Sequence, residues 1–247
     1  TNRDGTAFIP GGSFFNGQSQ SVTRFEKGYT PGYFYGFKTE GLFQNYDEIA
    51  NSPKQTGAVP GDIKFADLND DKVINDLDRT KIGDPFPIFT SGINLGAEYK
   101  GIDFNIFTYI SYGNDIYRAY ERNAQYSNKF RNILNRWTGE GTTNDARFPR
   151  YSFSDANSNI RVSDRYIEDG SFVKIKNIVL GYTLPKQWTQ KFMISSLKIY
   201  GQVKNPLTLT RYTGYDPEIP GGILDTGVDR GSYPQARTFS VGIDIRF

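Results

Sequence analysis

Apolar and polar residues alternate with a period of two along six segments of the chain: 32–38, 89–99, 102–112, 171–184, 196–204 and 237–247. Because the side chains of a strand point alternately to its two faces, each segment is predicted to be a strand with one apolar face. Within 171–184 the apolar residues change phase, which predicts a β-bulge near Asn177. Several segments approach the ~9–11 residues that a strand needs to cross a bilayer.

The connections between these segments alternate in length. Lys100 and Gly101 alone separate two of them, which predicts a tight hairpin turn, and about ten residues separate the fourth from the fifth. The three other connections, 39–88, 113–170 and 205–235, are long. Short periplasmic turns with long extracellular loops are typical of outer-membrane barrels. We therefore expect an all-β chain that supplies about six antiparallel strands of a transmembrane β-barrel in the bacterial outer membrane.

A soluble β-sandwich is the alternative, because a soluble sheet can turn the same apolar face onto a core. In that case the protein would be a secreted module that binds glycans through exposed tyrosines. Loops as long as 39–88 and 113–170 are uncommon in compact domains and favour the barrel.

The composition agrees with an all-β protein and excludes several kinds of chemistry. Aromatic residues make up 15% of the chain although the mean hydropathy is only −0.56. The net charge of +2 is too small to indicate nucleic acid as a partner. The chain has no His and no Cys, which excludes thiol nucleophiles, Ser-His-Asp triads and the usual zinc sites. The adjacent carboxylates Asp70/Asp71 and Glu168/Asp169 lie in predicted loops, so we expect no enzyme.

The segment "DLNDDKVINDLD" at 67–78 has the spacing of a twelve-residue calcium loop. The oxygen ligands would come from alternate positions, with Val73 contributing its carbonyl: Asp67, Asn69, Asp71, Val73, Asn75 and Asp78. Lys72 stands where such loops carry Gly, and Asp78 is shorter than the usual Glu. An Asx-rich turn capped by its own carboxylates is the alternative to a Ca²⁺ site.

Two long connections contain tyrosines next to amides and carboxylates, in "YGNDIY" and "RYTGYDPEI". Aromatic faces and amide groups suit sugars and peptides, so these side chains are candidates for substrate or lid contact: Tyr112, Asn114, Asp115, Tyr117, Tyr212 and Tyr215. An interfacial aromatic belt with ordinary turn chemistry is the alternative.

Four stretches carry a family resemblance: 32–49, 61–104, 166–185 and 197–218, among them "GDIKFADLNDDKVINDLDRTKIGDPFPIF" and "YIEDGSFVKIKNIVLGYTLP". Together with the terminal segment they resemble the C-terminal part of SusC-like TonB-dependent transporters of Bacteroidetes. The resemblance implies a barrel of about 22 strands, of which this chain lacks the plug and the N-terminal strands. It also implies import of oligosaccharides or oligopeptides, TonB as the energy source acting through the missing N-terminal region, and a SusD-like surface lipoprotein as a lid.

By the same resemblance, the terminal alternation is the signal read by the barrel-assembly machinery: Phe239, Val241, Ile243, Ile245 and Phe247. An open sheet in lipid would leave the polar groups of its edge strands unsatisfied. We therefore expect the segments at 237–247 and 32–38 to pair with strands from the N-terminal part of the barrel.

Overall fold

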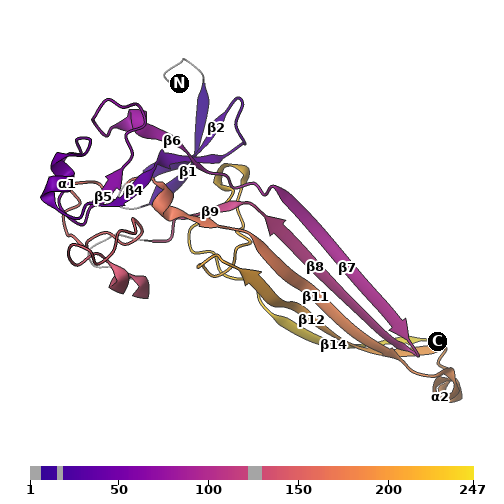
Figure 1. Cartoon of the computed structure of the whole chain (residues 1–247). Coiled ribbons are helices and arrows are strands. Elements are labelled where there is room, and N and C mark those ends of the chain that lie inside the picture. The colour runs from indigo at the N-terminus through magenta and orange to yellow at the C-terminus, as the bar shows by residue number, and fades with distance from the viewer. Residues whose placement is uncertain (1–6, 16–18, 122–129) are drawn as a thin grey trace. The chain divides into compact units, whose positions relative to one another are not determined.

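The computed structural model describes residues 7–15, 19–121 and 130–247 (Figure 1). The chain divides into two compact units. The sheet unit contains Pro87–Asn114, Asp169–Glu218 and Ser232–Phe247, and the loop unit contains Thr1–Phe86, Asp115–Glu168 and Ile219–Gly231. Strands predominate in both units, and none of the helices in the described part of the chain has the length and apolar character to span a membrane.

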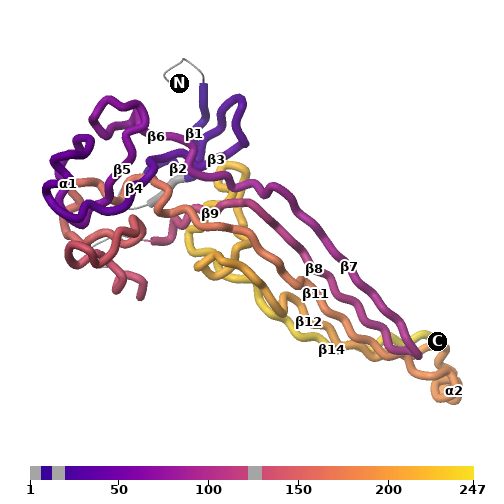
Figure 2. Tube along the Cα trace, viewed as in Figure 1, coloured from indigo at the N-terminus to yellow at the C-terminus, as the bar shows by residue number. Residues whose placement is uncertain are grey.

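The sheet unit is one antiparallel sheet of five long strands in the order β14-β12-β11-β8-β7, which run side by side in Figure 2. The strands are β7 (Phe89–Tyr99), β8 (Ile102–Tyr112), β11 (Phe172–Thr183), β12 (Ser196–Thr210) and β14 (Thr238–Arg246). The bounds of β7 and β8 are those expected from the alternation. β12 continues beyond the expected end at residue 204, past Asn205, whose φ is +51°.

The predicted hairpin and bulge are both present. Lys100 and Gly101 have φ values of +49° and +85° and connect β7 to β8, as a two-residue turn between twisted strands requires. The register of β11 against β8 shifts between Ile175 and Asn177. The connection from β11 to β12 contains the short helices α2 (Lys186–Thr189) and η4 (Gln190–Phe192).

The loop unit is built from short strands and turns. Its four-stranded sheet has the order β1-β2-β3-β6, formed by Phe8–Phe15, Ser19–Glu26, Tyr33–Phe37 and Arg79–Gly83. The other strands are β4 (Thr39–Leu42), β5 (Ile63–Phe65), β9 (Asp115–Arg118), β10 (Ile167–Asp169) and β13 (Val228–Asp229). The helices are α1 (Tyr46–Ala50), η1 (Asp76–Asp78), η2 (Arg131–Asn135), η3 (Asp164–Tyr166) and η5 (Ile223–Asp225).

The segment at 32–38 is a strand, but it does not lie in the long sheet. It forms β3, which pairs with β2 and β6, so the expectation that it would pair with a strand outside this sequence was wrong. The neighbours Tyr33 and Phe34 point to opposite faces and are both buried, with 2% and 0% of their surface exposed. A strand of a barrel wall has one face toward lipid, whereas β3 is covered on both. The sheet therefore contains five of the six expected strands.

The predicted long loops pack together in the core of the loop unit. Phe34 contacts Tyr117 with ring centroids 5.8 Å apart, and Tyr117 contacts Tyr166 at 5.5 Å. Val228, from the third predicted loop, belongs to the same buried cluster. A second cluster joins Phe37, Leu42, Ile63 and Phe65. Most of the first two connections and residues 219–231 of the third thus form one folded unit with the N-terminal segment.

Candidate functional site

One face of the long sheet carries apolar residues in continuous rows. The backbone register aligns one row across all five strands: Leu95, Ile106, Ile178, Val203 and Phe239. A second row across the same strands is Tyr99, Ile102, Tyr182, Ile199 and Ile243. Such rows follow from period-two alternation in every strand, because residues paired across strands lie on the same face.

The bulge in β11 keeps this face apolar along the whole strand. Val173 pairs with Ile110 before the bulge, and Ile178 pairs with Ile106 after it, so all four side chains share one face. Without the extra residue, one of the two apolar runs of β11 would point to the opposite face.

These apolar side chains are exposed within the described structure. The exposed fraction is 61% at Leu95, 56% at Leu180 and 84% at Val241. A soluble protein rarely leaves so continuous an apolar surface open to water, whereas a barrel turns it toward lipid.

The opposite face of the sheet is polar and internally hydrogen-bonded. Lys198 Nζ donates to Asp103 Oδ2 at 2.7 Å, and Gln202 Nε2 donates to Asn177 Oδ1 at 2.8 Å. A strand face that carries ion pairs and amides suits an aqueous lumen.

A buried lysine holds the segment that follows β12 against this polar face. Lys174, with 1% of its side chain exposed, donates to Asp216 Oδ2 at 2.8 Å and to Glu218 Oε2 at 3.1 Å. Asp216 also accepts from the backbone N–H groups of Glu218 and Gln235, at 3.0 and 3.1 Å. Burial by itself would raise the pKa of Asp216, but these hydrogen bonds lower that pKa below its ordinary value. We call Lys174, Asp216 and Glu218 the Lys174 cluster.

Sequence reasoning did not single out the Lys174 cluster, although both halves of it are visible in the sequence. The lysines of "VKIKN" occupy alternate positions of a strand, and "DPE" places two carboxylates two residues apart. Only the fold brings these segments together, since they are 42 residues apart in the chain.

The predicted contact residues have diverse environments. Asn114, Tyr117 and Tyr212 are buried, and Asp115 accepts the backbone N–H of Asp84 at 2.8 Å. Tyr112 packs on Phe89 at the end of the apolar face, with ring centroids 5.5 Å apart, as expected of an aromatic belt.

Of the same set, Tyr215 is the most exposed, with 75% of its surface accessible. Substrate or lid contact at these side chains stays a prediction. Because its side chain is the most exposed of the six, Tyr215 is the most accessible to a ligand.

The segment at 67–78 has the conformation of a tight oxygen-lined loop. Lys72 takes a φ of +65°, the left-handed region that Gly usually occupies at this position of a calcium loop. Asp71 Oδ1 accepts the backbone N–H of Val73, and Asp67 Oδ2 accepts that of Lys72. Asp78 is buried and accepts the N–H of Asn75 at 2.8 Å.

The fit of this loop to a metal ion is partial. Asp67 Oδ1 is buried without a hydrogen-bond partner in residues 7–15, 19–121 and 130–247, as a metal ligand would be before the ion binds. In the described part of the chain, however, no three acidic side chains converge closely enough to form a metal site on their own. A bound ion would therefore need the Asn oxygens and the Val73 carbonyl as well as the carboxylates.

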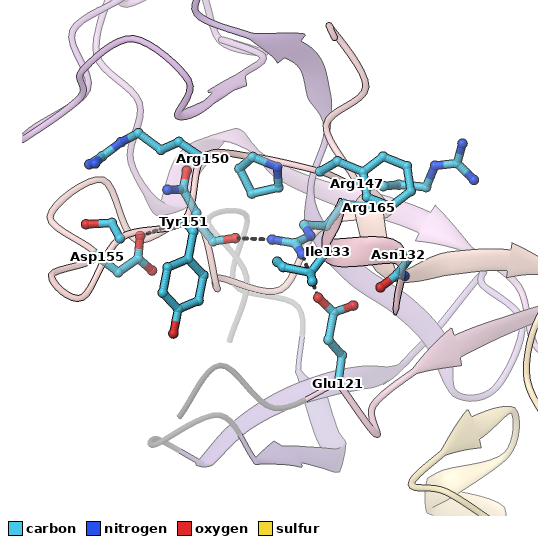
Figure 3. A pocket seen from close by; sticks show the side chains of 12 residues that line it. Glu121, Asn132, Ile133, Arg147, Arg150, Tyr151, Asp155 and Arg165 are labelled. Atoms are coloured by element: carbon cyan, nitrogen blue, oxygen red, sulfur yellow. Dashed lines mark hydrogen bonds and ion pairs between the residues drawn. The ribbon is translucent and has the colours of Figure 1, made fainter. Parts of the chain in front are cut away.

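A small pocket in the loop unit collects three arginines, Arg147, Arg150 and Arg165 (Figure 3). Arg165 donates to Glu121 at 3.0 Å, Arg150 donates to Asp62 at 2.7 Å, and Arg147 pairs with Asp145. The cavity has about 50 Å³, enough for water but not for a sugar or an amino acid. Its charges are matched within the unit, so this pocket has a structural role.

Comparison with known proteins points to one kind of transporter. The TonB-dependent receptor P3 of Formosa agariphila (strain DSM 15362 / KCTC 12365 / LMG 23005 / KMM 3901 / M-2Alg 35-1) is 34% identical over 250 residues, covering 96% of this chain and 24% of that receptor. The TonB-dependent receptor SusC of Bacteroides thetaiotaomicron is 27% identical over 238 residues, covering 96% of this chain and 21% of SusC.

The chain is homologous to TonB-dependent receptors. It spans about a quarter of the length of the curated relatives that it matches. No protein-family model matches the sequence. Among solved structures, the RagAB peptide transporter superposes with a TM-score of 0.68 at 24% identity, over 91% of this chain and 23% of that one. This likeness confirms the barrel fold expected from the alternation, of which the five-stranded sheet is a part.

The homology also decides between the expectations left open by the sequence. TonB-dependent receptors are outer-membrane β-barrel proteins and not enzymes, which confirms the expected location and the expected absence of catalysis. An open apolar sheet face is what such a barrel requires, whereas a soluble sandwich would bury it.

Proposed function

We propose that this chain forms part of the wall and the loop region of an outer-membrane nutrient importer. The importer takes up oligosaccharides or oligopeptides, draws energy from TonB, and is covered by a SusD-like lipoprotein. The homology with SusC supports this function, and the solved RagAB structures, described as a peptide transporter and a peptide importer, have the same fold.

The observation that carries the proposal is the exposed apolar face of the five-stranded sheet, with the polar, ion-paired face opposite it. In the described residues, β7 and β14 each pair with a single strand of this sheet. In lipid their outer edges need further strands, because unsatisfied N–H and C=O groups cost several kcal/mol each there. We therefore propose that both edges pair with the rest of the barrel.

Paired single cysteines in the full-length protein test the membrane orientation. This chain has no cysteine, so each introduced thiol reports one position once any cysteine elsewhere in the full-length protein is replaced. On β14, Ser240 and Val241 are neighbours that point to opposite faces. In intact outer membranes, Ser240→Cys should react with a water-soluble maleimide and Val241→Cys should not. Val241→Cys should react with a lipid-soluble maleimide instead.

Equal labelling of the two thiols by the water-soluble reagent would refute the barrel wall. Recovery of the protein in the soluble fraction without detergent would also refute it, and would favour the glycan-binding sandwich.

We also propose that the loop at 67–78 binds one Ca²⁺ ion. The one-three-five spacing of Asp67, Asn69 and Asp71, the left-handed Lys72 and the unpartnered Asp67 Oδ1 support this. Calorimetry on the full-length protein should detect one calcium site that Asp71→Ala removes. Asp70→Ala is the matched control, because Asp70 lies outside the ligand spacing. An identical titration for wild type and Asp71→Ala would contradict the proposal.

A further inference from the structure

A second cavity of the loop unit contains two arginines that form no ion pair in the part of the chain that the structure describes. It has about 610 Å³, within the range of small-molecule sites, and is lined in part by Arg79, Arg161, Asn75 and Ser158. All of its lining residues belong to the loop unit.

Arg161 is held in place by aromatic rings and backbone carbonyls. Its guanidinium carbon lies 4.5 Å from the ring centroid of Phe65 and 4.9 Å from that of Phe37. Its Nε donates to the carbonyl of Ser158 at 3.1 Å, and one terminal nitrogen donates to that of Asn157 at 2.8 Å. A guanidinium has five N–H donors, so donors remain for a ligand.

Arg79, the first residue of β6, is held in a similar way. Its guanidinium carbon lies 5.0 Å from the ring centroid of Tyr35, and its Nη2 donates to the Tyr35 carbonyl at 3.5 Å. Its Nε is buried and has no hydrogen-bond partner among the described residues. A buried donor without a partner costs about 1–3 kcal/mol, which a bound acceptor would recover.

The contrast with three other arginines of the unit is the decisive observation. The buried Arg118 and Arg165 and the half-buried Arg150 each form an ion pair, whereas in the described residues the half-buried Arg79 and Arg161 form none. Burial lowers the pKa of both Arg79 and Arg161 below the ordinary value, since the cation loses water without gaining a carboxylate contact. Asp76 lines the same cavity, but it is exposed and makes no ion pair with either guanidinium.

We propose that Arg79 and Arg161 form a binding site for a carboxylate group carried by an oligomeric ligand. Each preorganised guanidinium is opposite in charge to a carboxylate and matches its planar, two-pronged geometry. An acidic peptide and a uronate oligosaccharide both carry this group. That this ligand is imported cargo rests on the proposed import function. Binding of a carboxylate at this site does not depend on that function.

Binding of defined probes to the purified full-length protein in detergent tests the site. The probes are tetraglutamate and tetragalacturonate, each compared with its neutralised form, tetraglutamine or the methyl ester. We expect the wild type to bind at least one acid about tenfold or more tightly than its neutral form, which corresponds to one charge-assisted contact. Binding of tetraglutamate alone assigns a peptide source, and binding of tetragalacturonate alone assigns a glycan source.

Variants then assign the binding to this cavity. Arg161→Gln and Arg79→Gln should each weaken binding of the acid about tenfold and leave the neutral form unaffected. Arg230→Gln is the matched control, because Arg230 belongs to the same unit, is exposed and pairs with Asp225. Trypsin resistance of the loop unit, measured on each variant, distinguishes loss of the site from loss of the fold.

The proposal is overturned if the wild type binds neither acid, or binds acid and neutral form equally. It is also overturned if a folded Arg161→Gln variant binds as the wild type does. Failure of uptake in cells with binding intact would count against the import function alone.

Discussion

Replacement of Lys174 by methionine should release the segment that follows β12 from the polar face of the sheet. The substitution keeps the unbranched shape and most of the length of the side chain, and removes the ammonium group that Asp216 and Glu218 share. Asp216 then loses its lysine partner, whereas Glu218 keeps Lys176. Asp216 still accepts the backbone N–H groups of Glu218 and Gln235.

Removing one partner of a buried ion pair lowers the free energy of unfolding by roughly 3–5 kcal/mol, because the other charge stays buried without compensation. Glu218 has 36% of its side chain exposed, so solvent screens part of this loss. We therefore expect the local opening free energy to fall by about 2 kcal/mol, which corresponds to roughly thirtyfold faster exchange of amide hydrogens that are protected by this contact.

Hydrogen exchange of the Gln235 amide in the full-length protein measures this effect directly. Lys198→Met is the matched control: Lys198 pairs with Asp103 on the same face, but 32% and 24% of their side chains are exposed. The control should accelerate exchange at Gln235 by less than about twofold, since a partly exposed pair contributes little and lies elsewhere on the sheet. Unchanged exchange at Gln235 in Lys174→Met would refute the anchoring role.

The same contact predicts a dependence on pH. The pKa of Asp216 and that of Glu218 are both lowered: burial alone would raise them, but hydrogen bonds from the lysines outweigh it. A group with a depressed folded-state pKa stabilises the fold above its unfolded pKa and loses that contribution as the pH falls through the folded pKa. Protection of Gln235 should therefore be constant near neutrality and decline below about pH 4.

Two further substitutions and one deletion test the sheet. Val241→Arg should destabilise the folded barrel by about 2–4 kcal/mol in lipid vesicles, with Ser240→Arg on the lumen face as the milder control; equal effects would contradict the assigned faces. Gly101→Val should slow or reduce assembly of the barrel, because Gly101 has a φ of +85° and an added Cβ would lie 2.7 Å from the Thr183 carbonyl oxygen. Gly201→Ala is the control, because an added Cβ at Gly201 meets open space. Deletion of Phe247 should lower the yield of heat-modifiable barrel in the outer membrane, and an unchanged yield would remove this residue from the assembly signal.

Much of the long sheet was predictable from sequence because its determinants are local. In β7 and β8 the polarity of each residue indicates which face of the strand it occupies. The two residues between the strands, Lys100 and Gly101, are only enough for a tight two-residue hairpin turn. The bulge in β11 was visible as a phase change for the same reason. The lipid-facing side of each strand can be identified from the alternation alone, because its apolar side chains contact the bilayer and not another part of the protein.

The loop unit was not predictable in this way. Residues 33–37 show a strand pattern, but their place in a second sheet depends on pairing with β2 and β6. The segments expected to be separate loops share one core through Tyr117, Val162 and Val228, which are far apart in the chain. The candidate carboxylate site was missed because single arginines in loops carry no pattern.

The sequence by itself therefore determined that the chain is a β-protein with long strands, which faces of those strands are apolar, and which family it resembles. Period-two alternation and turn formation depend on residues that are close in the sequence, so both can be predicted without the tertiary structure. Only the tertiary structure decided which strands share a sheet, and that Lys174 pairs with Asp216 while Arg79 and Arg161 form no ion pair within the described residues. Charge pairing depends on distances between remote segments, and those distances exist only once the chain has folded.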